Sequence, residues 1–290
     1  MKFTVSHKTE YQYRTPASES YAELRLCPQT VGHQVVKKQS LTINPEVETE
    51  QYTDFFGNRV QYFSIPYRHE SLRITSRAEV ETSPVTMPEL ATEVTIAEAR
   101  QIMTNRLQAN YPFLQPTELV PLRQSIDPLK VTHLCKDSLT FGEAIVELNT
   151  WIFRNFKYKP GVTDITTPLP KIIKQRKGVC QDFAHLMLAI LRTFRLPARY
   201  VSGYIEAYDP ETTDPGLIGA AASHAWVEVA LPGGHWIGLD PTNNQIASER
   251  HVKVAVGRDY RDVAPLTGTF KGATDQKLEV IVSVKRKKSK

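Results

Sequence analysis

Residues 178–196, with the sequence GVCQDFAHLMLAILRTFRL, carry the strongest helical pattern in the chain. The pattern opens directly after Gly178 and stops before Pro197, because proline has no backbone N–H to donate and its ring restricts the preceding residue. Stretches with a strand-like composition then follow. They are residues 198–208, 223–231, 235–240, 252–256 and 278–284. Helices that precede a series of strands predict an α+β fold with an antiparallel sheet and argue against a βαβ array.

The first part of the chain has a different pattern. Four stretches rich in Val, Tyr, Phe and Thr, bounded by Pro, Gly and Asn, favour β-strands. They are residues 2–13, 22–28, 40–45 and 60–67. Gly57 and Asn58 separate two of the apolar runs and predict a hairpin there. Residues 1–85 are therefore expected to form an N-terminal all-β, sandwich-like domain.

Two prolines mark the end of this first domain. Pro84 and Pro88 lie in a candidate boundary at residues 83–90. Residues 86–125 are then expected to form a helical linker region. Residues 126–290 are expected to form a second domain that keeps the last strand of the chain.

Two helices are predicted before the one over residues 178–196. The first begins after Thr95, because Thr95 and Glu98 have the spacing of a capping box. The second covers residues 141–156, where apolar side chains recur at helical spacing on one face. They are Ile145, Leu148, Ile152 and Phe156, with Trp151 on the flank of that face. Trp151 is therefore expected in the core.

Composition and sequence pattern argue against a secreted, a membrane-spanning and a disulfide-rich protein. The 290 residues are 41% hydrophobic and 23% charged, as in ordinary globular proteins. The N-terminus alternates polar and apolar residues without a secretion-signal core, and no apolar run is long enough to cross a bilayer. Cys27, Cys135 and Cys180 are too few and too irregularly spaced for a disulfide framework, which favours a reducing compartment. We therefore expect a cytoplasmic protein with no membrane partner.

The charge of +5 is not distributed like a nucleic-acid surface. Part of it lies in the last six residues, KRKKSK, which indicate a solvated tail. A nucleic-acid site needs basic residues interleaved with aromatic ones along a groove. No nucleic-acid partner is expected.

Cys180 occupies an unusual position for a cysteine. It opens the long helical pattern instead of lying within its apolar face, although cysteines used for packing are usually buried there. A thiol at a helix start meets the positive end of the helix dipole, which favours the thiolate. A nucleophile, a metal ligand and an ordinary residue are the three possible interpretations.

His224 and Asp240 supply the partners that a nucleophilic thiol needs. If Pro232, Gly233 and Gly234 form a three-residue loop, the two residue numbers of each cross-strand pair sum to 466. His224 is then the diagonal neighbour of Asp240 on the same face of the hairpin. Diagonal neighbours lie about 7–8 Å apart, within reach of a His–Asp hydrogen bond. A two-residue loop would put them on opposite faces. A catalytic triad therefore predicts a three-residue loop or a bulge that restores the parity.

The triad assigns a role to each residue. Cys180 attacks an acyl carbon, His224 transfers the proton, and Asp240 orients His224 and stabilises its charged form. The backbone N–H of Cys180 is a natural oxyanion donor. The further candidates for oxyanion stabilisation or substrate contact are Tyr158, Gln181, Trp226 and Tyr204.

Each residue also has a simpler explanation. Cys180 could be a small residue tolerated at a helix start, His224 a satisfied sheet histidine, and Asp240 a turn residue before Pro241. His185 lies five positions after Cys180 and points away from it, which disfavours a zinc site on this helix. It is expected either in the core or next to the site residues, where a hydrogen bond from its ring would fix a neighbouring element. No metal and no cofactor are predicted.

Several short motifs resemble the bacterial branch of the transglutaminase-like superfamily, whose members are often described as cysteine proteases. They are GVCQDFAHL, PARYVSGY, HAWVEV and LDPTNN, in the family's order. YAELRLCP and FGNRV are similar to the β-domain that precedes the catalytic domain in that branch, and VAVGRDYRDVAPLTG to the segment after the catalytic aspartate. The family's triad falls on Cys180, His224 and Asp240.

The resemblance implies a papain-like catalytic core in residues 126–290 that acts on amide bonds through a thioester. A peptide or protein substrate is expected, with hydrolysis slightly favoured over transamidation. No acidic cluster resembles the calcium sites of animal transglutaminases. The alternatives are a binding module that has kept the fold without catalysis and, less favoured, a zinc protein. The oligomeric state stays open.

Overall fold

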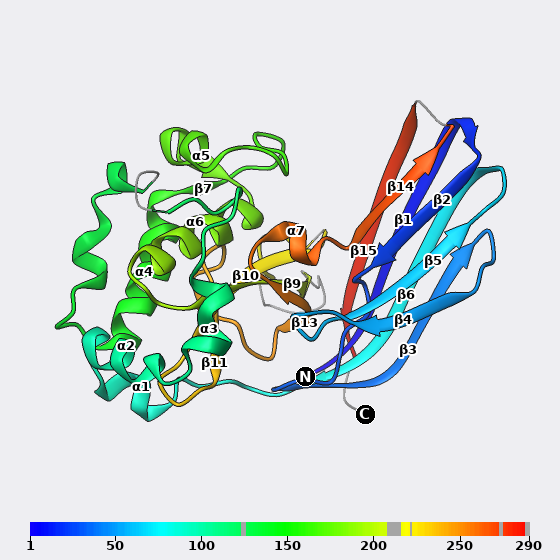
Figure 1. Cartoon of the computed structure of the whole chain (residues 1–290). Coiled ribbons are helices and arrows are strands. Elements are labelled where there is room, and N and C mark those ends of the chain that lie inside the picture. The colour runs from blue at the N-terminus through cyan, green and yellow to red at the C-terminus, as the bar shows by residue number, and fades with distance from the viewer. Residues whose placement is uncertain (123–125, 208–215, 221, 273–274, 288–290) are drawn as a thin grey trace.

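The computed structural model describes residues 1–122, 126–207, 216–220, 222–272 and 275–287. Figure 1 shows two parts. A pair of long-stranded sheets lies on one side, the helices lie on the other, and β9, β10 and β13 lie between them. Among the described residues, no helix is long and apolar enough to cross a membrane. Much of the connection between the stretch 198–208 and His224 lies outside the described residues.

Two four-stranded antiparallel sheets form what we call the β-sandwich. One sheet has the order β15-β1-β6-β3 and the other β14-β2-β5-β4. The six strands before residue 83 are β1 Lys2–Ala17, β2 Glu19–Leu24, β3 Gln34–Asn44, β4 Thr49–Thr53, β5 Arg59–Ile65 and β6 His69–Thr82. Alternate side chains of both sheets, among them Leu24, Phe63 and Ile74, close one apolar core. The predicted hairpin joins β4 to β5.

The last two strands of the chain return to the β-sandwich. β14 (Leu266–Lys271) pairs with β2, and β15 (Gln276–Arg286) pairs with β1 from Phe3↔Arg286 to Tyr13↔Gln276. The expectation that the final strand belongs to the second domain is therefore corrected. The long alternating strand β1 has β6 on one side only, so its other edge accepts β15. A pattern read along the chain gives no information about such a distant pairing.

Short helices connect the β-sandwich to the rest. They are α1 Glu89–Glu93, α2 Ile96–Thr104, α3 Leu107–Asn110 and the 3-10 turns η1 Tyr111–Leu114, η3 Asp127–Leu129 and η4 Val131–Cys135. The predicted capping box is present at Thr95 and Glu98. The helix α4 covers Phe141–Asn155 and buries Ile145, Leu148 and Ile152, as expected from their spacing.

A five-stranded antiparallel sheet, which we call the central sheet, has the order β12-β11-β10-β9-β13. Its strands are β9 Ala198–Ile205, β10 His224–Ala230, β11 Trp236–Asp240, β12 Gln245–Ile246 and β13 His251–Gly257. The helix α6 (Cys180–Thr193) covers β9 and β10 and is buried almost throughout. The remaining elements are the strands β7 (Lys157–Tyr158) and β8 (Lys177–Gly178) and the helices α5 (Leu169–Gln175) and α7 (Tyr260–Val263).

The hairpin between β10 and β11 has the register expected from a three-residue loop. Val227 pairs with Leu239 and Ala230 with Trp236, so paired numbers sum to 466. The N–H of Leu231 donates to the carbonyl of His235. The parity prediction is confirmed, and His224 and Asp240 lie on the same face of the sheet.

Two side-chain amides of the β-sandwich cap the edge of the central sheet. Gln34 bonds both the N–H and the carbonyl of Lys253 at 2.7 Å. Asn58 makes the same pair of bonds to Val256, also at 2.7 Å. Each amide therefore satisfies an edge strand as a neighbouring strand would, because it offers one donor and one acceptor. This docking makes the β-sandwich part of the central sheet's hydrogen-bond network.

The variant Gln34→Leu should lower the free energy of unfolding by about 2–4 kcal/mol, because it leaves two backbone groups of Lys253 and the carbonyl of Gln29 without this partner in a partly buried place. Gln34 is fully buried. Urea unfolding measures the difference. Gln12→Leu, an exposed change on the same β-sandwich, should cost less than about 0.5 kcal/mol. Equal effects in the two variants would contradict the edge-capping role.

Candidate active site

Cys180 is the first residue of α6, and a buried carboxylate holds the start of that helix. Asp182 accepts a 2.7 Å hydrogen bond from the N–H of Val179 and another from the hydroxyl of Thr163. A Cβ at Gly178 would lie 2.5 Å from Asp182 Oδ2, so only glycine fits there. These contacts fix the backbone on both sides of Cys180. The residue Cys180 is 9% exposed, at the margin of the buried core.

His224 begins β10 and makes its strongest contact with Asp240. Its Nε2 lies 2.9 Å from Asp240 Oδ2, and both side chains are fully buried. Its Nδ1 is buried and has no hydrogen-bond partner in the described part of the chain. The Cys180 thiol interacts with the same ring. The nitrogen available to exchange a proton with Cys180 is therefore Nδ1.

The ionisation of this pair follows from the buried carboxylate. Burial alone would lower the pKa of His224, but the Asp240 carboxylate and the Cys180 thiol outweigh burial and raise this pKa to about 10. For Asp240, burial acts to raise the pKa, and His224 and His251 together hold it below its usual range. At neutral pH the site therefore contains an imidazolium and a carboxylate.

Asp240 is held by more donors than the hairpin alone supplies. The backbone N–H groups of Thr242 and Asn243 donate to Oδ1 at 2.9 and 3.2 Å. The side-chain amide of Asn243 donates to Oδ2 at 2.8 Å, and Nε2 of His251 lies 3.2 Å from the same oxygen. His251 and Asn243 are not among the residues that the sequence pattern indicated. Asn243 follows Asp240 by three residues, so a turn after Asp240 could have indicated it from the sequence. His251 lies near Asp240 because of the strand order of the central sheet, which the sequence pattern does not show.

Tyr158 lies beside the candidate nucleophile. Its strand β7 runs parallel to β8, which leads directly into Cys180. Burial, with a smaller contribution from Cys180, raises the pKa of the Tyr158 hydroxyl. A Cβ at Gly219 would lie 2.9 Å from His224 Nδ1 and 3.5 Å from the Tyr158 hydroxyl. Tyr158, His224 and Gly219 therefore meet at one place, next to Cys180.

The other three candidates lie in different surroundings. Gln181 is half-buried in the first turn of α6, beside Cys180. Trp226 is buried and stacks on the His224 ring at 6.3 Å, with its indole against Gly203 and Gly238. At 1% exposure, Trp226 packs against the histidine ring instead of forming part of the protein surface.

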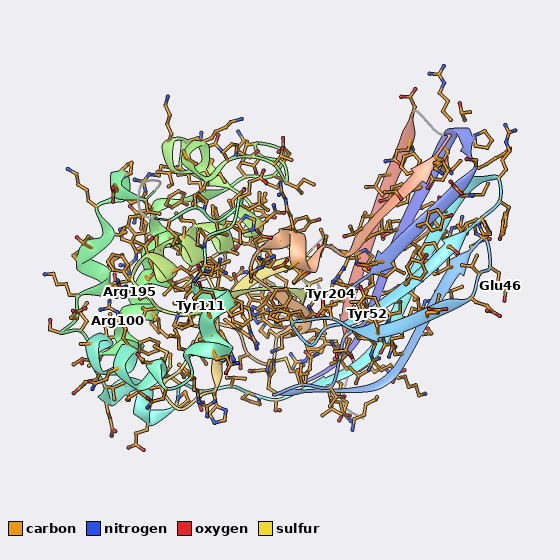
Figure 2. The ribbon with its side chains drawn as sticks, viewed as in Figure 1. Glu46, Tyr52, Arg100, Tyr111, Arg195 and Tyr204 are labelled. Atoms are coloured by element: carbon orange, nitrogen blue, oxygen red, sulfur yellow. The ribbon has the colours of Figure 1, made fainter. Side chains whose placement is uncertain are left out.

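Tyr204 does not belong to the site. It lies where the helical part meets the β-sandwich (Figure 2), and its hydroxyl is 3.0 Å from His7 Nδ1. The residue is almost fully buried, and burial raises the pKa of its hydroxyl. Its selection as a substrate contact is corrected: the apolar and aromatic pattern of β9 does not show which residues face the β-sandwich.

His185 lies in the core, as expected. Its Nε2 accepts the N–H of Tyr260, and burial lowers the pKa of His185 to about 3, so it is neutral. Among the described residues, no group of three or more His, Cys, Asp or Glu side chains is arranged to hold a metal ion.

Family models match two separate parts of the chain. The "Bacterial transglutaminase-like N-terminal region" matches residues 3–81, and the "Transglutaminase-like superfamily" model matches residues 130–241. The second match contains Cys180, His224 and Asp240.

The chain is similar to one protein over nearly its whole length and to another over a short stretch. It is 33% identical to an uncharacterized protein of Mycobacterium leprae, over 98% of this chain and 99% of that protein. A protein-glutamine gamma-glutamyltransferase of Pseudomonas aeruginosa is 33% identical over 95 residues, which make up 33% of this chain and 14% of that protein.

A solved structure shares the whole architecture. It is "a Putative Cysteine Protease from Cytophaga hutchinsonii", which superposes with a TM-score of 0.69 at 25% identity, over 97% of this chain and 90% of that one. With the two model matches, this likeness defines the fold as α+β, with a transglutaminase-like core and a strand-rich N-terminal region. The chain belongs to the transglutaminase-like superfamily.

Proposed function

We propose that this protein cleaves amide bonds of peptides or proteins through a thioester on Cys180, with water as the acyl acceptor. One observation carries the proposal. His224 binds Asp240 through Nε2, and its Nδ1, beside the thiol at the start of α6, has no hydrogen-bond partner among the residues that the structure describes. This is the arrangement that a thiol nucleophile, its proton carrier and an orienting carboxylate require.

The first half of the reaction forms the thioester. The Cys180 thiolate attacks the amide carbon, a C–S bond forms, and the carbonyl oxygen becomes an oxyanion. When the tetrahedral intermediate collapses, the C–N bond breaks and Nδ1 of His224 gives its proton to the leaving amine. Asp240 stabilises the imidazolium before this transfer, since its carboxylate raises the pKa of His224.

Two groups are placed to stabilise the oxyanion. The backbone N–H of Cys180 lies in the first turn of α6, where N–H groups have no intrahelical acceptor. The hydroxyl of Tyr158 lies near both Cys180 and His224. Donors that point to the developing charge contribute strongly when they are preorganised in this way.

The second half of the reaction decides between hydrolysis and transamidation. Water gives its proton to Nδ1 of His224 and attacks the thioester, the C–S bond breaks, and the acid leaves as the thiolate re-forms. An amine would react in the same way and give a new amide. We favour water because its exclusion needs an enclosed apolar channel. Tyr158 and His224 instead put polar groups beside Cys180.

Labelling with a peptidyl chloromethyl ketone should be confined to Cys180 in the native protein at pH 7. Cys27 and Cys135 are buried, and burial raises the pKa of both thiols, to about 12 for Cys135. His224→Ala should slow labelling of Cys180 by roughly 10²–10⁴-fold, because it removes the group that exchanges the thiol proton. Mass spectrometry of each cysteine gives the rates.

Turnover is tested with dimethylcasein, with and without monodansylcadaverine. We expect new peptide ends or free ammonia without amine incorporation, and a fall of at least ~10³-fold in Cys180→Ser. Incorporation of the fluorescent amine would instead assign transamidation. If Cys180 is labelled no faster than Cys27 and Cys135 and no turnover is seen, the protein is a binding module that has kept the fold without catalysis.

The pKa of His224 should be about 10 in the native protein and should fall in Asp240→Asn, because the variant removes the carboxylate and leaves the opposing effect of burial. Since the folded pKa lies above the unfolded value of about 6.5, the protonated ring contributes stability below pH 6.5 and this contribution is lost as pH rises through about 10. The stability difference between wild type and Asp240→Asn should therefore narrow above neutral pH.

Histidine-selective NMR titration measures the pKa, and urea unfolding at several pH values measures the stability. His69→Leu, a change in the β-sandwich, is the control and should leave the titration of His224 unchanged. An unperturbed His224 pKa in wild type would show that the carboxylate does not hold the imidazolium.

A further inference from the structure

We propose that His251 is a positioning residue for the Asp240–His224 pair and that the β-sandwich holds His251 in place. This inference rests on the proposed function, since it assigns a role within the same site. It also gives the N-terminal β-sandwich a task in the reaction.

The Asp240 carboxylate is fully engaged. Oδ1 accepts two backbone N–H groups, and Oδ2 accepts His224 Nε2, Asn243 Nδ2 and His251 Nε2. A carboxylate offers about four lone-pair directions, so five donors leave it no freedom to rotate. Two of the described donors to Oδ2, His224 and Asn243, belong to β10 and to the turn that follows β11. The third, His251, belongs to a different strand, β13.

The hydrogen bonds of His251 fix its tautomer and its charge. The N–H of Ser248 donates to His251 Nδ1 at 3.3 Å, so the proton of a neutral ring lies on Nε2, which faces Asp240. Burial lowers the pKa of His251 and keeps the ring neutral. The charged groups near the ring are Asp240, His224 and Arg250, and Arg250 is paired with Glu206. Because His251 is a neutral donor, it orients the Asp240 carboxylate without neutralising it. The negative charge of Asp240 therefore remains available to stabilise the His224 imidazolium.

The segment that carries His251 is anchored at three points, two of them on the β-sandwich and one on the connection that follows β6. The hydroxyl of Thr82, the last residue of β6, donates to the carbonyl of Glu249 at 2.5 Å. The N–H of Val85 donates to the hydroxyl of Ser248 at 2.8 Å. His33 Nε2 lies 3.4 Å from the carbonyl of His251. Ser248 therefore links the connection after β6 to Nδ1 of His251, because the Ser248 N–H donates to that nitrogen.

A buried histidine could also serve only to fill space. His251 does pack edge-on against Trp226, at 5.2 Å between ring centroids. Packing alone, however, needs neither a fixed tautomer nor a donor directed at Oδ2. The two explanations differ in what a substitution that keeps the donor will do.

His251→Leu keeps a bulky side chain in the packed site but removes the donor, whereas His251→Gln keeps an N–H that can reach Asp240. Loss of the donor should lower the rate of Cys180 labelling by about 10–100-fold, as removal of partners that orient reactive ligands typically does. The glutamine variant should recover most of this rate. His69→Leu removes another buried histidine, bonded to Ser20 and to the carbonyl of Tyr67, and should leave the labelling rate unchanged.

Thr82→Val tests the contribution of the β-sandwich. It should lower the labelling rate by roughly 2–30-fold, because it releases the carbonyl of Glu249. When Thr82→Val is combined with His251→Leu, the loss of labelling rate should be smaller than the product of the two separate losses. Both variants act through the hydrogen bond between His251 and Asp240. Thr9→Val is the matched control, because the Thr9 hydroxyl bonds His7 within β1.

NMR gives a readout that needs no substrate. The Nε2–H of His251 should be observed with an unprotonated Nδ1 between pH 6 and 8, and exchange of the His224 Nε2–H should accelerate in His251→Leu. A charged His251, equal losses in His251→Leu and His69→Leu, or no recovery in His251→Gln would overturn the inference. A wild-type protein without labelling or turnover, but with both NMR signatures, would overturn the proposed function alone.

Discussion

The burial of the Asp240 carboxylate is the constraint on which the rest of this structure depends. A charge without access to water is costly unless partners compensate for it. Here the compensation comes from five donors, one of them an imidazolium, which are supplied by β10, by the turn after β11 and by the start of β13. The hairpin register, the strand order and the anchoring of the 248–251 segment are therefore linked, because a shift in any of them would leave the carboxylate under-compensated.

Local signals predicted much of this arrangement. The Pro-Gly-Gly loop set the parity of the hairpin, and parity decides which side chains share a face, so His224 and Asp240 could be paired from sequence. The helix α6 and the position of Cys180 followed from one apolar pattern with a proline at its end. The motifs of the superfamily placed the same three residues together. The family matches and the shared architecture confirm the fold.

Contacts between distant segments could not be predicted in this way. His251 belongs to β13, which pairs with β9, so no hairpin relation connects it with Asp240. Tyr204 has the same aromatic character as Tyr200 in the same strand, yet it bonds His7 of the β-sandwich while Tyr200 packs on His185. Local patterns show that a residue is buried, but they do not show what covers it. The return of β14 and β15 to the first sheets is a larger example of the same limit.

That return affects the order in which the protein can assemble. β15 flanks β1 on one side and β14 flanks β2 on one side, and both strands follow the whole of the central sheet in the chain. On a ribosome, α6, the hairpin and β13 emerge while both sheets of the β-sandwich still lack one strand. The segment bearing the nucleophile thus lies between the first six strands of the β-sandwich and its last two, and the β-sandwich is completed only after β15 has been synthesised.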